Sequence, residues 1–234
     1  MVDLISVMEG ISASFCERVQ EDPRFSAVFG GTPSESEYVD WFLVDTFYDV
    51  LGTPGYCAAG GQRLKESGEL TPAHRLISET LFEKATEEQT ESGQGHELWA
   101  LHDIAAVKGW ELDQAASWVR QHTPSPGSLS YNDFFKFITT ANPIGILGLA
   151  FTREYMANEL ATQAAKNLRE RSDIPNIAKA TVFLGGHGEA DADHVKELYP
   201  ILDAIEDQAD KEVVIMAARV SVESYLAKAV TRHK

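Results

Sequence analysis

Helical spacing of apolar residues is the feature that most restricts what this chain can fold into. Apolar residues recur every three or four positions through most of the 234 residues, and alternating apolar and polar runs extend over only a few positions. Short groups of Gly, Pro and Ser separate the periodic segments. The pattern predicts an all-α protein. Because 44% of the residues are apolar and the connections are short, we expect residues 1–234 to form a single domain of about seven to eight helices.

The positions of Gly and Pro predict where helices begin and end. We expect a first helix before residue 25, another from about Glu35, a break at 52–55 with a continuation to Leu64, and a helix from Pro72 toward Thr90. The segment 91–96 interrupts the pattern, which resumes through Val107. Later helices are expected at about 111–121, 128–141, 143–171, 174–189 continuing or bending into 190–208, and 209–232.

The acidic composition excludes several classes of partner. The chain carries 36 Asp and Glu against 20 Lys and Arg, and its formal net charge of −16 would repel a phosphate backbone or an anionic membrane surface. We therefore expect neither nucleic acid nor a membrane as a partner. Cys16 and Cys57 form no Cys-x-x-C motif, the first residues lack an export signal, and no apolar stretch is long enough for a membrane span. These features predict a soluble cytoplasmic protein.

Two histidines and an aspartate late in the chain share one face of a predicted helix. His187, Asp191 and His194 stand at positions i, i+4 and i+7, which fall within an arc of about 60° at about 100° per residue. Imidazole nitrogens and a carboxylate at this spacing can bind a first-row transition metal from one helix. The same spacing also arises by chance in a helix rich in Asp and Glu, with the histidines as ordinary core or surface residues.

Two other segments supply further candidate ligands. Glu91 and His96 flank a segment with two glycines, which allow a helix to distort so that both side chains turn inward. A solvated loop is the alternative, because Glu87, Glu88 and Glu91 form an acidic run. Glu154 follows a nearly unbroken apolar segment, so its carboxylate either enters the interior, where Arg153 or another cation would have to balance it, or lies solvated on the opposite face. Together, three carboxylates and three imidazoles are the inventory of a two-metal site in a helical bundle.

The sequence resembles the heme-oxygenase-like diiron oxidases, also called iron-containing redox enzymes. They belong to the wider fold group of TenA-type thiaminases and the pyrroloquinoline-quinone synthesis oxidase. The resemblance covers most of the chain, from the aromatic segment at Tyr38–Leu64 to Leu202, and its most specific part is the stretch from Phe183 to Leu198. It implies an all-α, heme-oxygenase-like (TenA-like) helical bundle.

The resemblance also implies a metal site. In the family, a late helix carries a His, an acid four residues later and a second His three residues after that. A Glu further upstream, and a Glu-x-Gly segment that leads to a His, supply the other metal ligands. The implied iron ligands are Glu91, His96, Glu154, His187, Asp191 and His194. Because the interval between the family's Glu and His varies, Glu88 could replace Glu91.

The implied activity is that of a non-heme diiron enzyme that uses O2 to oxidise a small organic substrate, an amino acid or fatty acid derivative. Heme is not expected, because heme oxygenases carry their proximal His on the first helix and the first His here is His74. Thiaminases of this fold use a mid-chain Cys nucleophile, and no Cys follows Cys57. A cofactor-free or thiaminase-like protein that binds or hydrolyses a small heterocycle is the alternative. An external electron donor and a homodimer are left open.

Overall fold

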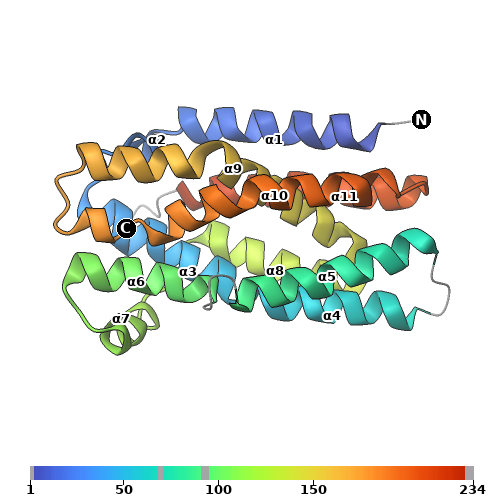
Figure 1. Ribbon diagram of the computed structural model, residues 1–234, viewed down its shortest axis with the longest axis horizontal. Coiled ribbons are helices and arrows are strands. Elements are labelled where there is room, and N and C mark those ends of the chain that lie inside the picture. Colours follow the sequence, from blue (N-terminus) through green and yellow to red (C-terminus); the bar gives the residue numbers. More distant parts are fainter. Residues whose placement is uncertain (1–2, 68–70, 91–94, 230–234) are drawn as a thin grey trace.

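The computed structural model describes residues 3–67, 71–90 and 95–229, apart from the side chains of residues 90 and 189–192. Every regular element within these ranges is helical, and most helices run along the long axis of the molecule (Figure 1). The α-helices are α1 (Leu4–Glu21), α2 (Pro23–Gly30), α3 (Val44–Leu51), α4 (Thr53–Glu66), α5 (Pro72–Thr90), α6 (His96–Lys108), α7 (Leu112–Val119), α8 (Pro126–Ala141), α9 (Ile146–Arg171), α10 (Val182–Asp203) and α11 (Gln208–Leu226). A π-helical segment, η1 (Ser36–Leu43), and three 3-10 segments, η3 (Pro143–Gly145), η4 (Ile177–Lys179) and η5 (Ala227–Ala229), connect or extend them.

Capping explains where the first helices break. The Asp22 carboxylate accepts two backbone N–H groups at 2.9 and 3.1 Å, and Pro23 takes the first position of α2. Gly31 ends α2 with a left-handed φ of 83°, and a side chain there would overlap the backbone of Asn167 on α9. The end of α2 is therefore held against α9.

The all-α prediction is confirmed, but the expected number of helices is wrong. Eleven α-helices occur in the described ranges. Asp22 and Pro23 divide the expected first helix into α1 and α2, and the expected break at 52–55 separates two distinct helices, α3 and α4. The predicted start of the helix at 174–189 is also wrong. The 3-10 segment η4 comes first, and α10 starts only at Val182 and then continues through Pro200.

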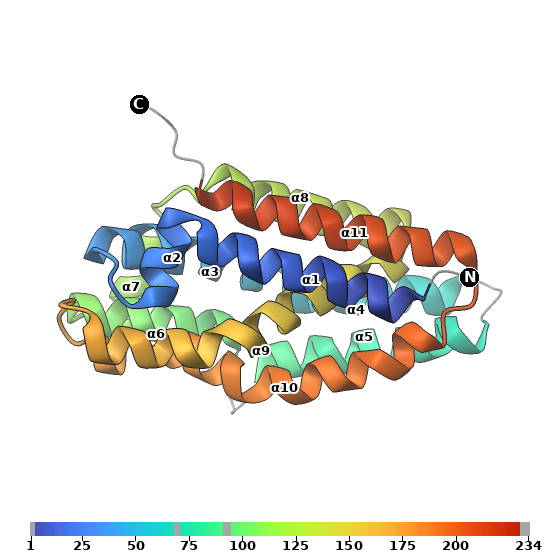
Figure 2. The ribbon, with the colours of Figure 1, turned by 90° about the horizontal axis from the view of Figure 1, so that it is seen from above.

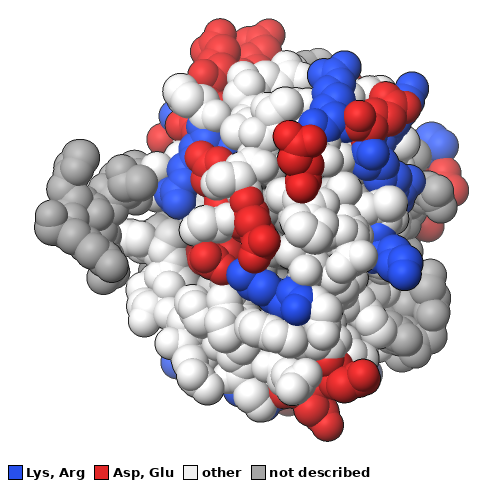
Figure 3. All heavy atoms as spheres, turned by 90° about the vertical axis from the view of Figure 1, so that its left-hand side faces the viewer, with Lys and Arg blue, Asp and Glu red and all other residues white. Residues whose placement is uncertain are grey.

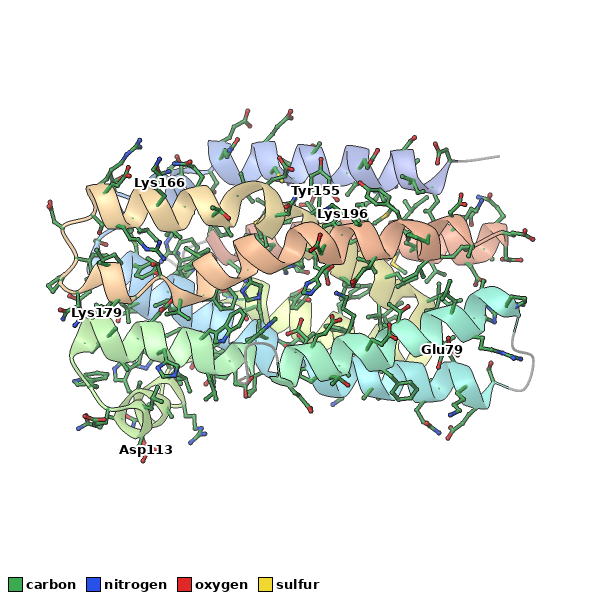
Figure 4. All side chains as sticks on the ribbon, in the orientation of Figure 1. Glu79, Asp113, Tyr155, Lys166, Lys179 and Lys196 are labelled. Carbon is green, nitrogen blue, oxygen red and sulfur yellow. The ribbon has the colours of Figure 1, made fainter. Side chains whose placement is uncertain are left out.

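Two apolar cores meet along α9. The first core contains α2, η1, α3, α6 and α7 with the C-terminal half of α9. The second contains α4, α5, α8 and α11 with the N-terminal half of α9 and the later part of α10. Figure 2 shows α8 and α11 along one edge of the molecule and α5, α6 and α10 along the other. Side chains fill the space between these helices (Figure 4).

The surface carries both signs of charge. On the end of the molecule in Figure 3, acidic and basic side chains lie close together among uncharged ones. Of the helices described, none is both long and apolar enough to cross a membrane.

Candidate functional site

A cavity of about 140 Å³ lies where the two cores meet. Apolar residues of both cores line it, together with two groups of charged or imidazole side chains. The larger group, here called the histidine–carboxylate cluster, comprises Lys84, Glu87, Glu88, His96, Glu154, His187 and His194. The smaller group, here called the arginine cluster, comprises Asp49, Arg153 and Lys228.

One half of the histidine–carboxylate cluster is built where α5 ends and α6 begins. Glu88 Oε2 lies 2.8 Å from His96 Nδ1, and the rings of His96 and His187 have centroids 4.5 Å apart. Trp99 packs on both imidazoles, at 4.4 and 5.2 Å between centroids. Burial raises the pKa of Glu88, but its contact with His96 and the positive charge of its neighbours outweigh burial and lower the pKa on balance. Glu88 therefore stays a carboxylate in the interior.

The orientation of His187 is set by its own helix. Its Nδ1 lies 2.9 Å from the carbonyl oxygen of Phe183, and because a carbonyl can only accept, Nδ1 is the donor. A neutral ring protonated at Nδ1 carries its lone pair on Nε2. Metal-binding histidines are typically fixed in this way by a hydrogen bond from the other ring nitrogen.

Asp103 on α6 holds the start of the helix that carries His187. Its carboxylate oxygens accept the backbone N–H groups of Val182 at 2.8 Å and Phe183 at 3.0 Å. Asp103 is fully buried, and burial outweighs these two hydrogen bonds, so that its pKa rises to about 7. Sequence reasoning missed this residue. A lone acid in an otherwise apolar stretch of α6 was the available signal.

The other half of the cluster is arranged around a buried lysine. Lys84 Nζ lies 3.0 Å from Glu87 Oε2 and 3.3 Å from Glu154 Oε1, and His194 Nε2 lies 3.8 Å from Glu87 Oε2. The Lys84 side chain is 7% exposed. Burial lowers the pKa of Lys84, but the two carboxylates outweigh it and raise the pKa on balance. Lys84 therefore supplies the positive charge that compensates Glu154.

A glycine allows α9 and α10 to approach closely beside the cluster. A side chain at Gly188 would overlap the backbone of Thr162 on α9. The glycine after His187 is therefore explained by helix packing, and it brings the histidine face of α10 close to α9.

The structure brings four of the six predicted ligands to one cavity. His96, Glu154, His187 and His194 line it, as does Glu88, the alternative to Glu91. Glu91 lies outside the described residues, and Asp191 lies in α10 without a described side chain. Among the side chains that are described, no three of His, Cys, Asp or Glu are spaced to hold a metal ion. The donor atoms, imidazole nitrogen and carboxylate oxygen, nevertheless suit iron.

Sequence reasoning missed Lys84, Glu87 and the arginine cluster. Lys84 and Glu87 belong to the acidic run at the end of α5, which has the composition of a solvated face. Their burial depends on how α5 packs against α9 and α10, which the spacing of residues along α5 does not reveal. The sequence offered Arg153 as a possible counter-ion of Glu154, but Lys84 is the cation beside Glu154, and Arg153 lies near Asp49.

Comparison with known proteins identifies the fold. No protein-family model matches the chain, and no curated protein does. A crystal structure from Shewanella denitrificans, of a domain of unknown function with a heme oxygenase-like fold, matches with a TM-score of 0.76 and 20% identity over 98% of this chain and 91% of that chain. A TenA homologue from Pseudomonas syringae pv. tomato matches with a TM-score of 0.75 and 12% identity over 97% of this chain and 91% of that chain. The chain therefore has the heme oxygenase-like fold that the sequence predicted.

Proposed function

We propose that this protein is a non-heme iron enzyme that activates dioxygen to oxidise a small organic substrate. The observation that supports the proposal is the convergence of Glu88, His96, Glu154, His187 and His194 on one cavity. The fixed orientation of His187 adds to it, because Nε2 of that ring carries the lone pair that a metal needs.

The residues divide into two ligand sets in this proposal. Glu88 or Glu91 with His96 and His187 would hold one iron ion, and Glu154, Asp191 and His194 would hold the other. When bound, a pair of ferrous ions supplies electrons for the reduction of dioxygen. The apolar walls of the cavity would limit the access of bulk water to the substrate, and Lys84 compensates part of the negative charge of Glu87 and Glu154.

Iron retention tests the proposal. Metal-free protein is mixed with Fe(II) without oxygen, desalted and assayed for iron, and then exposed to air while visible absorption is recorded. We expect the wild type to retain iron and to show a transient absorption, and His187→Ala to lose both. His74→Ala is the matched control, because His74 contacts Asp210 at 3.1 Å and does not line the cavity. Equal iron retention by the wild type and His187→Ala contradicts the proposal.

A second candidate is a cofactor-free protein that binds or hydrolyses a small heterocycle. Two observations favour it: the fold is shared with a TenA homologue, and Lys84 Nζ lies 3.0 Å from Glu87 and 3.3 Å from Glu154, so a cation of the protein itself compensates carboxylate charge there. Cys57 lines the cavity, but its burial and the charges of Glu88 and Glu154 raise its pKa well above the usual range, which leaves the thiol a poor nucleophile. This candidate predicts hydrolysis of a thiamine-like base that chelators do not affect.

A further inference from the structure

The arginine cluster is held rigidly at the cavity wall. The Arg153 guanidinium lies between two aromatic rings, 4.2 Å from the centroid of Tyr131 and 4.3 Å from that of Tyr225. Its Nε donates to Ser221 Oγ at 3.2 Å, and its Nη1 lies 3.7 Å from Asp49 Oδ2. These contacts fix the plane of the guanidinium before any ligand arrives.

One nitrogen of this guanidinium has no acceptor among the residues that the structure describes. Arg153 Nη2 is buried, and within the described part of the chain it makes no hydrogen bond. A buried donor left without an acceptor is costly, and Arg153 lines the cavity. The position therefore favours a ligand that brings an acceptor atom to Nη2.

The charges of the cluster favour a negatively charged acceptor. Arg153 and Lys228 are two cations, and Lys228 is 4% exposed. Asp49 is the one carboxylate of the cluster, and its oxygens already accept from Ser128 Oγ at 2.6 Å and from Lys228 Nζ. Asp45, also buried on α3, accepts the Ser125 N–H at 2.7 Å and does not line the cavity. Within the arginine cluster, two cations thus face one carboxylate, whereas the histidine–carboxylate cluster has Glu87, Glu88 and Glu154 against Lys84. The arginine cluster is therefore the part of the wall with a surplus of one positive charge and of hydrogen-bond donors.

We propose that the arginine cluster binds the carboxylate of a small ligand whose apolar remainder extends toward the histidine–carboxylate cluster. The two clusters come from opposite edges of the molecule: Arg153 contacts residues of α3, α8 and α11, whereas Lys84, His96 and His187 lie on α5, α6 and α10 (Figure 2). Binding of the carboxylate does not depend on the proposed function. Only the reaction at the other end of the ligand rests on that function.

Charge and size restrict the ligand further. An amine would meet Arg153 and Lys228 with like charge, and a doubly charged phosphate would exceed the single surplus charge. The remaining wall of the cavity is mostly apolar, with Val50, Ile146 and Leu147 among its residues. A cavity of about 140 Å³ is close to the size of cavities that hold one benzene molecule. A monocarboxylate with a short alkyl chain or one ring therefore fits best.

Paired acids and amides test the proposal on the wild-type protein. Butanoate, hexanoate, octanoate and benzoate are each compared with the corresponding primary amide by calorimetric titration of the metal-free chain. We expect at least one acid to bind at least ~10-fold more tightly than its amide, because a hydrogen bond to a charged group contributes more than a neutral one. Equal binding of every acid and its amide, or binding of none of the acids, overturns the proposal.

Substitutions at the cluster then assign the preference to named residues. Arg153→Gln and Lys228→Met should each remove most of the preference for the acid. Arg169→Gln should keep it, because Arg169 lies on the same helix but donates to Thr181 Oγ1 at 2.7 Å outside the cavity. Circular dichroism checks that each variant is folded. If Arg153→Gln does not fold, Lys228→Met and the wild-type comparison decide. A folded Arg153→Gln that keeps the preference overturns the proposal.

Iron retention is measured on the same preparations, so the two proposals fail separately. A wild type that retains iron but does not distinguish acids from amides contradicts the carboxylate site alone. A wild type that prefers acids but retains no iron contradicts the proposed iron chemistry alone.

Discussion

The buried Lys84 and its two carboxylate partners, the partly exposed Glu87 and the largely buried Glu154, form a charge group whose members depend on one another. Removing one partner of a buried pair leaves the others without compensation, whereas removing an exposed partner changes little. The Glu154 side chain is 14% exposed, and Lys84 Nζ lies 3.3 Å from its Oε1. The consequences of removing Lys84 should therefore show both in stability and in the response to metal.

We expect Lys84→Met to lower the free energy of unfolding of the metal-free protein by about 2–4 kcal/mol. Added Co(II) should recover part of this loss, because a divalent cation can take over the compensation of Glu87 and Glu154. Urea denaturation with and without Co(II) measures both effects. Lys196→Met is the control: Lys196 (Figure 4) pairs with Asp193 at the surface, so a loss below about 1 kcal/mol is expected. A Lys84→Met protein as stable as this control contradicts the prediction.

Substitution also decides whether Glu88 or Glu91 is the iron ligand. Because Glu88 contacts His96, we expect Glu88→Gln to weaken iron binding at least ~10-fold, and Glu91→Gln to have a smaller effect. Equilibrium titration with Fe(II) under anaerobic conditions gives the two affinities. The opposite order would make Glu91 the ligand.

At this scale, the sequence was informative where one helix fixes the geometry. His187 and His194 are seven residues apart on α10, so the spacing alone predicted that they lie on one face of the helix. The burial of Lys84 and the pairing of Glu88 with His96 could not, because each depends on contacts between helices that are distant in the chain.

At the scale of the helix, the contact of Asp103 with the start of α10 predicts a dependence on pH. The pKa of Asp103 is about 7 in the folded protein and about 3.9 in an unfolded chain. Between these values the folded state binds more protons than the unfolded state, so stability decreases as pH rises, by about 1.4 kcal/mol per pH unit at most. Above the folded pKa this decrease ends.

The variant Asp103→Asn should lack this pH-dependent contribution to stability. We expect the wild type to lose stability relative to the variant between about pH 5 and pH 7, as followed by urea denaturation at several pH values. Asp113→Asn, at an exposed position of α7 (Figure 4), should parallel the wild type. Parallel curves for the wild type and Asp103→Asn would contradict the pKa assigned to Asp103.

Helix boundaries were predictable where capping residues mark them, as at Pro72 of α5 and Gly52 between α3 and α4. The start of α10 was not. Residues 174–181 have helical apolar spacing, but Asn176 adopts a left-handed φ of 59° and the tertiary contact with Asp103 begins the helix only at Val182. A contact from α6 thus overrides the local pattern.

Helix α9 belongs to both cores and should make them unfold together. Phe151 on α9 is fully buried in the second core, whereas Trp41 and Trp118 belong to or pack against the first. We expect Phe151→Ala to cost about 3–5 kcal/mol and to shift the urea midpoint equally by tryptophan fluorescence and by circular dichroism. Phe137→Ala, at a position 58% exposed on α8, should have little effect. Two separate midpoints for Phe151→Ala would mean that the cores unfold independently.

The architecture was the most predictable level, because helical periodicity along most of the chain leaves few alternatives to a bundle. The cavity was the least predictable, because its lining comes from elements spread from α2 to η5.

The position of Arg153 and Glu154 next to each other in α9 has a consequence for ligand length. Each residue of an α-helix advances about 1.5 Å along the axis, so one rigid segment sets the spacing between the two attachment points. A shift of α9 along its axis would move Arg153 and Glu154 together and leave the distance between them unchanged. Variants that accept longer or shorter molecules should therefore be sought in the walls that other helices form, at residues such as Val50 of α3 and Leu81 of α5, and not in α9 itself.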